Sequence, residues 1–155
     1  MIHRFHHGPQ PWHDALYAAI RAEQAARPGW KLGVSRGASW SGPKRFHEHP
    51  AAEGLLALLR IALRDVAGPG TPDLVLWPNV THRGGSCGVH DHANGSNVWS
   101  GCYYLTEGAP IVFPARGLTI EPEPGLLLLF AAAEPHRVSR QISAAPRVSV
   151  AMNAT

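Results

Sequence analysis

The feature that most constrains the fold of this chain is a series of short apolar runs in its second half. The runs are rich in Val, Ile, Leu, Tyr and Trp, and Gly, Pro, Asn or Ser residues separate them. Both properties are typical of β-strands joined by turns. The predicted strands are DLVLWPNV (73–80), NVWSGCYYLT (97–106), PIVFP (110–114), LTIEP (118–122), GLLLLFA (125–131), HRVSRQI (136–142) and RVSVAMN (147–153). Strands spaced this closely favour an antiparallel barrel or sandwich.

Two amphipathic helices are predicted before these strands. The first lies in PWHDALYAAIRAEQAARPG (11–29), with a proline near its start and Pro-Gly at its end. The second lies in AAEGLLALLRIALRDVAG (51–68), where aliphatic residues recur at spacings of three and four. A Gly/Ser-rich connector joins them. We therefore expect a mainly β fold of the α+β class, with two supporting helices packed on one outer face.

The length of the chain fits one domain. Its 155 residues are 45% hydrophobic and 16% charged, which is typical of a compact globular protein. We expect a single domain over residues 1–155, with a helical N-terminal part at about 10–67 and a β core at about 73–153. A chain of this length has little material for lids, which favours an open site or one that a partner subunit completes, as in a homodimer.

Charge and hydropathy argue against two classes of partner. The net charge is only +3, and the 14 basic residues are dispersed along the chain, so nucleic-acid binding is not expected. The longest apolar stretch, GLLLLFAAA (125–133), is far shorter than the roughly 18 residues that span a bilayer. We expect no membrane partner, and a small molecule or peptide as substrate.

Cysteine usage and the N-terminal sequence predict a cytoplasmic protein. The opening of the chain has no apolar segment of the kind that a secretory signal needs. Cys87 and Cys102 are expected to be small buried hydrophobic residues rather than a redox pair. The polar N-terminus, which carries His3, His6 and His7, is expected to be exposed and poorly ordered.

Two His-x-His pairs occur in the chain. His90 and His92 lie in an extended segment, where residues two apart point to the same side and can chelate one ion. His47 and His49 fall just before the second helix, so we interpret them as solvated or capping residues. The first pair is therefore the candidate metal motif.

A third histidine and an arginine extend this candidate site. His136 opens a predicted strand, and the short segment 143–146 is expected to form a hairpin turn. Arg147 would then lie near Arg140, about 13 Å from His136 along the sheet. A dicarboxylate could bind the metal at one end and the forked guanidinium of Arg147 at the other. Ser149, two residues along, would face the same way and add a hydroxyl donor.

Four segments together resemble the Fe(II)- and 2-oxoglutarate-dependent oxygenases. They are WPNV (77–80), HDHANGSNVWSGCYYL (90–105), PEPGLLLLFAAAEPHRV (122–138) and RVSVAMN (147–153). The resemblance is closest to a small bacterial group with His-x-His in place of the usual His-x-Asp, and it covers residues 75–153. It implies a double-stranded β-helix, the jelly-roll or cupin-like architecture.

The resemblance implies that His90, His92 and His136 ligate Fe(II). His92 departs from the family, because most members have a carboxylate there and form a 2-His-1-carboxylate triad. Asp91 cannot simply replace it, since an adjacent strand residue points to the opposite face. Three neutral imidazoles leave the metal one negative charge short, so the identity of the metal stays open.

The resemblance also implies a site for 2-oxoglutarate. Arg147 and Ser149 would receive its distal carboxylate, and the hydroxyl of Tyr104 would point at the same group. Asn79 is a further candidate for a hydrogen bond to the cosubstrate or the substrate. With O2 at the metal, the implied reaction is hydroxylation of a small molecule or peptide, with release of succinate and CO2.

Two Gly- or Pro-bounded loops are expected to shape the substrate entrance. They are THRGGSCG (81–88) and FPARG (113–117), and their candidate contacts are His82, Arg83 and Arg116.

Two alternatives stay open. A cupin-like metal enzyme that does not use 2-oxoglutarate is supported by Gly84, which precedes His90-Asp91-His92 at the spacing of the first cupin motif. The glutamate expected four or five residues after the second histidine is absent, because Ser96 and Asn97 occupy those positions. A non-catalytic jelly-roll binding module is the other alternative, since the architecture alone does not specify function.

Overall fold

A computed structural model describes residues 1–155 and shows a mainly β protein with two α-helices. The helices are α1 (His13–Ala26) and α2 (Glu53–Ala67), and the 3-10 turns are η1 (Phe46–Glu48), η2 (Pro50–Ala52) and η3 (Pro114–Arg116). The strands are β1 (Ile2–His6), β2 (Ser35–Arg36), β3 (Ser39–Ser41), β4 (Leu74–Thr81), β5 (Ser86–His90), β6 (Trp99–Tyr104), β7 (Ile111–Phe113), β8 (Leu118–Ile120), β9 (Leu126–Ala131), β10 (His136–Val138) and β11 (Arg147–Ala154).

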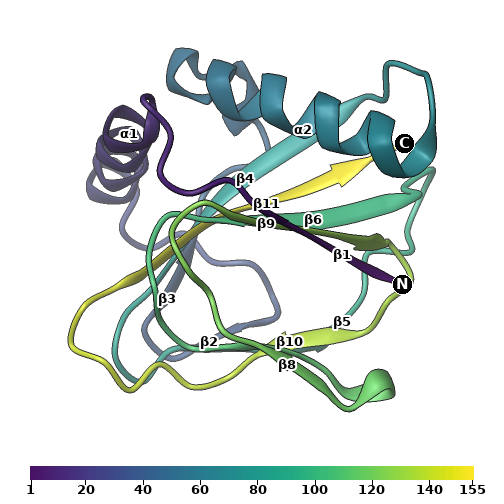
Figure 1. Ribbon diagram of the computed structural model, residues 1–155. Helices are drawn as coiled ribbons and strands as arrows, with labels where there is room; N and C mark the ends of the chain where they lie inside the picture. The colour runs from purple at the N-terminus through teal and green to yellow at the C-terminus, as the bar shows by residue number, and fades with distance from the viewer.

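The strands form two antiparallel sheets that face each other. The larger sheet has six strands in the order β1-β9-β6-β11-β4-β3, and the smaller has five in the order β2-β5-β10-β7-β8. Both helices lie on the outer side of the large sheet, and the small sheet lies on its other side (Figure 1). The predicted mainly β architecture with two helices on one outer face is confirmed.

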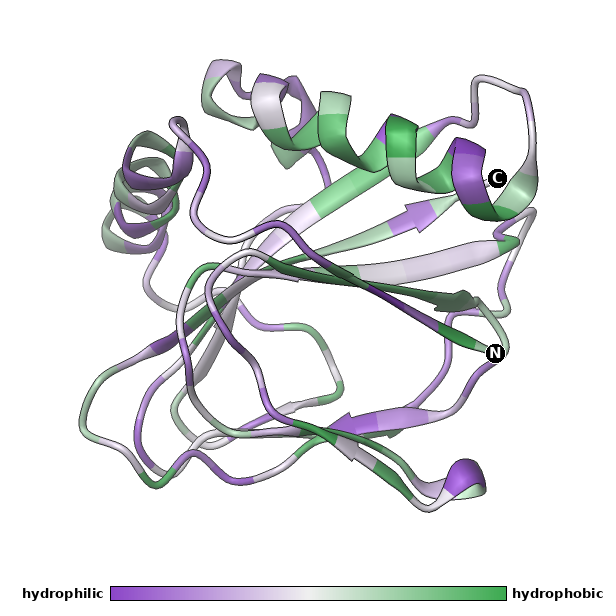
Figure 2. Cartoon of the chain, viewed as in Figure 1, coloured by the Kyte–Doolittle hydropathy of each residue, from purple (hydrophilic) through white to green (hydrophobic).

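Two hydrophobic clusters hold the layers together. One lies between the helices and the large sheet, and the other lies between the two sheets. Strand β9 serves both, because Leu127 and Leu129 face the helices while Leu126, Leu128 and Phe130 face the small sheet. Figure 2 accordingly shows β9 as an almost continuous hydrophobic strand. A strand that is covered on both faces has no polar alternation.

The central strands β4 and β11 have two different faces. Their side chains toward the helices are apolar and buried: Leu74, Leu76, Val80, Val148, Val150, Met152 and Ala154. Those toward the small sheet include Trp77, Asn79, Thr81, Arg147, Ser149 and Ala151, which line a cavity. The antiparallel register pairs Arg147 with Thr81 and Ser149 with Asn79. Because strand side chains alternate, a single register sets both faces.

Four strands lie where the sequence pattern did not predict them. The N-terminus is ordered as β1, which pairs with β9 from Ile2 to His6, and this corrects the expectation of a poorly ordered end. Ile2 and Phe5 pack against the two hydrophobic clusters, which explains why this short edge strand is ordered. The connector between the helices contributes β2 and β3, and the polar segment Ser86–His90 forms β5.

The hairpin expected between the last two strands is also wrong. Strand β10 pairs with β5 and β7 in the small sheet, whereas β11 pairs with β4 and β6 in the large one. Gln141 anchors the crossing segment. Its main-chain N–H donates to the Gly85 carbonyl at 2.8 Å, and its side-chain oxygen accepts from the Ala109 N–H at 2.7 Å. Arg147 therefore pairs with Thr81 and not with Arg140.

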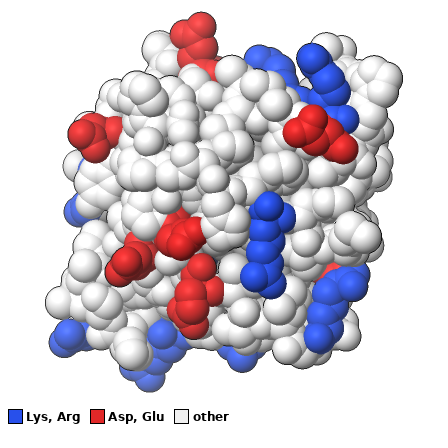
Figure 3. All heavy atoms as spheres, in the orientation of Figure 1, with Lys and Arg blue, Asp and Glu red and all other residues white.

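The surface gives two further observations. On the face in Figure 3, Lys and Arg side chains are dispersed among uncharged ones rather than gathered in one patch. Neither α-helix has the length and hydrophobicity that crossing a bilayer would require.

Candidate active site

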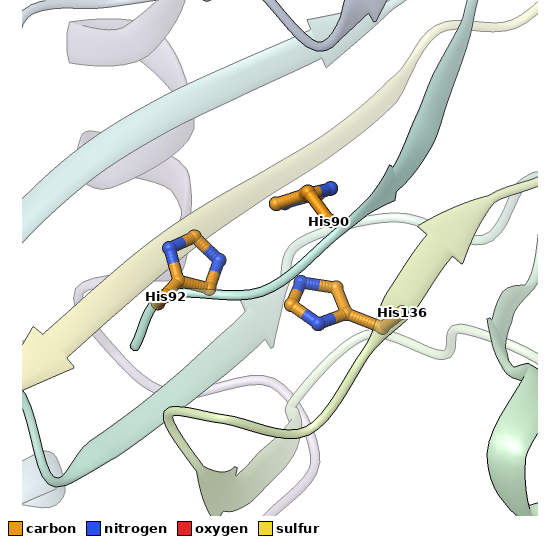
Figure 4. A group of neighbouring side chains, drawn as sticks. All are labelled: His90, His92 and His136. Atoms are coloured by element: carbon orange, nitrogen blue, oxygen red, sulfur yellow. The ribbon is translucent and has the colours of Figure 1, made fainter. Parts of the chain in front are cut away.

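Three histidines converge between the two sheets. His90 ends β5 and His136 opens β10, and the two are directly paired across the small sheet. One ring nitrogen from each of His90, His92 and His136 lies within 4.8 Å of the others (Figure 4). Strand β5 stops at His90, so the loop that follows, rather than strand alternation, brings His92 to the site. One ion can contact all three imidazoles.

Main-chain carbonyl oxygens fix the tautomers of two of these rings. Nδ1 of His90 lies 2.8 Å from the Gly88 oxygen, and Nδ1 of His136 lies 2.9 Å from the Glu134 oxygen. A carbonyl oxygen only accepts, so each Nδ1 carries the proton and each Nε2 keeps a free lone pair. The ring of His92 is held by packing, with its centroid 5.6 Å from that of Trp77.

Burial keeps two of these histidines, His92 and His136, neutral. Desolvation, followed by the neighbouring imidazoles, lowers the pKa of His92 to about 3. Desolvation also lowers the pKa of His136 to about 4. Both rings are therefore uncharged at neutral pH, which is the form that binds a metal.

Neither acidic residue next to the triad belongs to it. The Asp91 side chain is exposed, and its oxygen accepts the Ala93 N–H at 3.0 Å. The buried carboxylate of Glu134 instead accepts a hydrogen bond from Arg116 at 2.6 Å. The donor set is therefore three neutral imidazoles, one negative charge fewer than in a triad with a carboxylate.

The triad shares a cavity of about 310 Å³ with Arg147, Ser149 and Asn79. Arg147 is only 2% exposed; its Nε donates to the Ala109 oxygen at 2.9 Å, and its Nη1 donates to Ser149 Oγ at 3.3 Å. No acidic side chain forms a salt bridge with Arg147. A buried cation without a counter-charge is costly, so the site favours an anionic ligand.

Tyr104 presents a second unsatisfied group beside this arginine. The Arg147 guanidinium lies 5.1 Å from the Tyr104 ring centroid, and the Tyr104 hydroxyl is buried without a hydrogen-bond partner. Burial raises the pKa of this hydroxyl well above its usual range, so it stays a proton donor. Tyr104 pairs with Ser149 in register but does not itself form part of the cavity wall.

Asn79 extends the polar wall. Its side-chain oxygen accepts a hydrogen bond from Ser41 Oγ at 2.7 Å. This contact orients the amide so that its nitrogen remains available as a donor to the cavity.

The three candidate substrate residues lie outside the cavity wall. His82 contacts the Gln24 amide at 3.0 Å, and Arg83 donates to the Ile142 oxygen at 3.1 Å. Arg116 is paired with Glu134, as described above. The structure does not bring these residues to the triad, and their contact with a substrate stays a prediction.

Several wall residues were missed by sequence reasoning. The connector supplies Lys44, and β5 supplies Cys87. Cys87 is half-buried, and its sulfur lies 3.7 Å from Nδ1 of His90, so it is more than the buried hydrophobe that was expected. Desolvation raises the pKa of its thiol to about 11, which keeps it protonated. The alternating Ser-Trp-Ser of residues 39–41 was the available signal for β3.

The fold is shared with solved oxygenase structures. A Pseudomonas putida prolyl-4-hydroxylase has a TM-score of 0.74 at 19% identity, over 99% of this chain and 91% of that one. An oxidoreductase of the 2OG-Fe(II) oxygenase family from Burkholderia pseudomallei has a TM-score of 0.68 at 19% identity, over 90% and 78%. The nogalamycin epimerase SnoN, solved with Fe3+ and alpha ketoglutarate, has a TM-score of 0.73 at 13% identity, over 99% and 78%.

These similarities confirm the predicted fold class, a double-stranded β-helix with supporting helices. At 13% to 19% identity they establish the fold and not the reaction. No protein-family model matches the chain, and no curated protein sequence matches it.

Proposed function

We propose that this protein, which has the double-stranded β-helix fold of the 2-oxoglutarate-dependent oxygenases, is itself an Fe(II)- and 2-oxoglutarate-dependent oxygenase. One observation carries the proposal. A three-histidine cluster shares one cavity with a buried arginine that has no acidic partner. A ligand that joins a metal to this arginine needs a chelating group at one end and a carboxylate at the other, as 2-oxoglutarate has.

The residues of the triad fit a divalent transition metal. His90, His92 and His136 would hold it through imidazole nitrogens, which suit Fe(II) but also Zn, Ni and Cu. When bound with 2-oxoglutarate, Fe(II) supplies the activation of O2, so that one oxygen atom enters succinate and the other hydroxylates a second substrate while CO2 leaves. The protein has to orient both substrates and exclude water around this chemistry.

The cosubstrate residues would act through hydrogen bonds and charge. Arg147 would bind the distal carboxylate with its guanidinium, and Ser149 Oγ would support the same end of the ligand. The unpartnered hydroxyl of Tyr104 would donate toward this carboxylate, which offsets the cost of burying it. Asn79 would donate its amide nitrogen to the cosubstrate or to the substrate.

The absence of a carboxylate ligand favours a second candidate, a cupin-like metal enzyme that does not use 2-oxoglutarate. Such an enzyme would use the same three histidines but would have no need for the Arg147 site. The response to 2-oxoglutarate distinguishes the two candidate functions more directly than identification of the primary substrate would.

The test is anaerobic addition of 2-oxoglutarate to the Fe(II)-loaded protein. An oxygenase of this type should develop a weak visible charge-transfer band, and in air it should convert 2-oxoglutarate slowly to succinate without a second substrate. His136→Ala should show neither signal. Tight metal binding without a spectral response would favour the cupin-like enzyme, and binding of neither would favour a non-catalytic jelly-roll module.

A further inference from the structure

The cavity contains a second cation, Lys44, in addition to Arg147. Lys44 lies in the connector after β3, and its ammonium nitrogen is 4.7 Å from the centroid of the Trp77 ring. The Trp77 ring is in turn 5.6 Å from that of His92. Through Trp77, the Lys44 side chain is thus placed beside the metal triad.

Lys44 is not paired with any acidic group of the protein. No salt bridge or hydrogen bond is formed by its ammonium, whereas the other lysine, Lys31, donates to the Gly37 oxygen at 2.6 Å. Asp91 is the single acidic residue in the cavity wall, and it forms no salt bridge with Lys44. Lys44 is an exposed residue, so in the free protein its charge is solvated and available to a ligand.

The two cations lie at opposite ends of the cavity face of β4 and β11. Lys44 covers Trp77, which pairs with Ala151, and Arg147 pairs with Thr81. Trp77 and Thr81 are four residues apart on one strand, or about 13 Å. The two cations, one buried and one exposed, are therefore separate binding points, and each can bind an anionic group of its own.

The charge of the proposed complex leads to the same conclusion. Three neutral histidines supply no negative charge to a divalent metal, and the two carboxylates of 2-oxoglutarate would be occupied at the metal and at Arg147. The charge of Lys44 then remains available to a second anion beside the substrate space. A single ammonium without further donors suits a monoanion such as a carboxylate better than a phosphate dianion, which needs several donors.

We infer that the second substrate of this protein is an organic carboxylate, and that Lys44 binds its carboxylate group above Trp77 and next to the metal triad. The inference rests on the proposed function, because it assigns Arg147 to the cosubstrate and leaves Lys44 for the substrate. Lys44 would then determine substrate specificity, and it lies in a connector that contains none of the residues proposed to bind the metal or the cosubstrate.

The experiment uses a matched pair of small probes on the metal-loaded protein with 2-oxoglutarate, under anaerobic conditions. The probes are para-fluorophenylacetate and its neutral amide, and fluorine NMR measures their dissociation constants. In the wild type the carboxylate should bind about tenfold more tightly than the amide. Lys44→Met, which keeps the apolar stem over Trp77, should abolish this preference, and Lys44→Arg should retain it. Lys31→Met, the matched control, should behave as the wild type.

Three outcomes would overturn the inference: equal binding of the two probes, no binding of the carboxylate, or an unchanged preference in Lys44→Met. A loss of 2-oxoglutarate affinity in Lys44→Met would also overturn it, because Lys44 would then belong to the cosubstrate site. The visible band with 2-oxoglutarate is recorded on the same sample before the probe is added. If the proposed function is wrong, the visible band does not develop. If only the Lys44 assignment is wrong, the band develops and only the fluorine NMR result differs from the expected one.

Discussion

The two faces of the large sheet are made by the same strands but differ in chemistry. Toward the helices, β4 and β11 present a continuous apolar surface that includes Leu76 and Val150. Toward the small sheet, the alternate residues present Asn79, Arg147 and Ser149 to the cavity. One backbone register therefore places both the main hydrophobic cluster and the candidate active site.

The comparison shows how stability and binding are divided. The helix face contributes apolar burial, whereas the cavity face holds a buried cation without a counter-ion and a buried hydroxyl without a partner. Such groups lower stability until a ligand satisfies them. Substitutions on the helix face should therefore change folding, and those on the cavity face should change binding.

The largest effect is expected from the metal triad. His90→Ala, His92→Ala and His136→Ala should each lose bound metal. Removing a group that only orients a metal ligand lowers metal affinity by roughly 10–100-fold, and removing the ligand itself should lower it further. Elemental analysis after dialysis measures the metal content. His47→Ala and His49→Ala are the matched controls, since their rings accept hydrogen bonds from the Leu76 and Ala51 N–H groups. If these controls lose metal and the triad variants keep it, the metal-binding pair is His47 and His49 rather than His90 and His92.

Leu76→Ala tests the helix face. Leu76 is 0% exposed, so its truncation should lower the free energy of unfolding by about 2–5 kcal/mol through lost burial and a residual cavity. Chemical denaturation measures this change, and metal content per folded molecule should stay at the wild-type level. Val89→Ala is the control, because Val89 is 59% exposed and should change stability little. A Leu76→Ala protein that folds normally but loses metal would contradict the division between the two faces.

Arg147→Ala tests the cavity face. Removing one member of a desolvated charge pair should weaken 2-oxoglutarate binding by about 2–5 kcal/mol. This corresponds to a roughly 30-fold to several-thousand-fold rise in the dissociation constant, with metal affinity nearly unchanged. Arg147→Lys should recover only part, since an ammonium keeps the charge but not the planar fork. Anaerobic titration decides; equal constants for wild type and Arg147→Ala would remove the cosubstrate site from this cavity.

Tyr104→Phe should give the smallest effect, with opposite signs in two assays. Loss of one hydroxyl should weaken 2-oxoglutarate by about 0.5–2 kcal/mol. The same change removes a buried group that has no partner, so the free protein should become as stable as the wild type or more stable. Thermal unfolding with and without the cosubstrate measures both. A destabilised free protein would show that the hydroxyl has a structural partner.

Local sequence patterns predicted the elements in which the arrangement of apolar residues shows which positions are buried. Helix α2 has clear apolar periodicity, strand β9 is a continuous apolar run, and the triad was found because His90 and His92 are spaced for chelation. The pattern failed where pairing over long distances decides the structure. Strand β5 has the composition of a loop, and the crossing held by Gln141 depends on contacts with Gly85 and Ala109 that no local sequence signal contains.

The cavity wall was predicted only in part for the same reason. Arg147 and Ser149 could be assigned to one face by alternation along a single strand. Lys44 could not, because it reaches the cavity through a connector whose position depends on β3 pairing with β4.

The carbonyl acceptors behind His90 and His136 have an evolutionary consequence. Every residue type has a main-chain oxygen, so no substitution at Gly88 or Glu134 can delete the acceptor that fixes each ring. A side-chain substitution at these two positions leaves the acceptor in place, and only a change that shifts the backbone would disturb it. His92 relies on the side chain of Trp77, which mutation can replace. Sequence drift can therefore reorient this third ligand while the other two stay fixed.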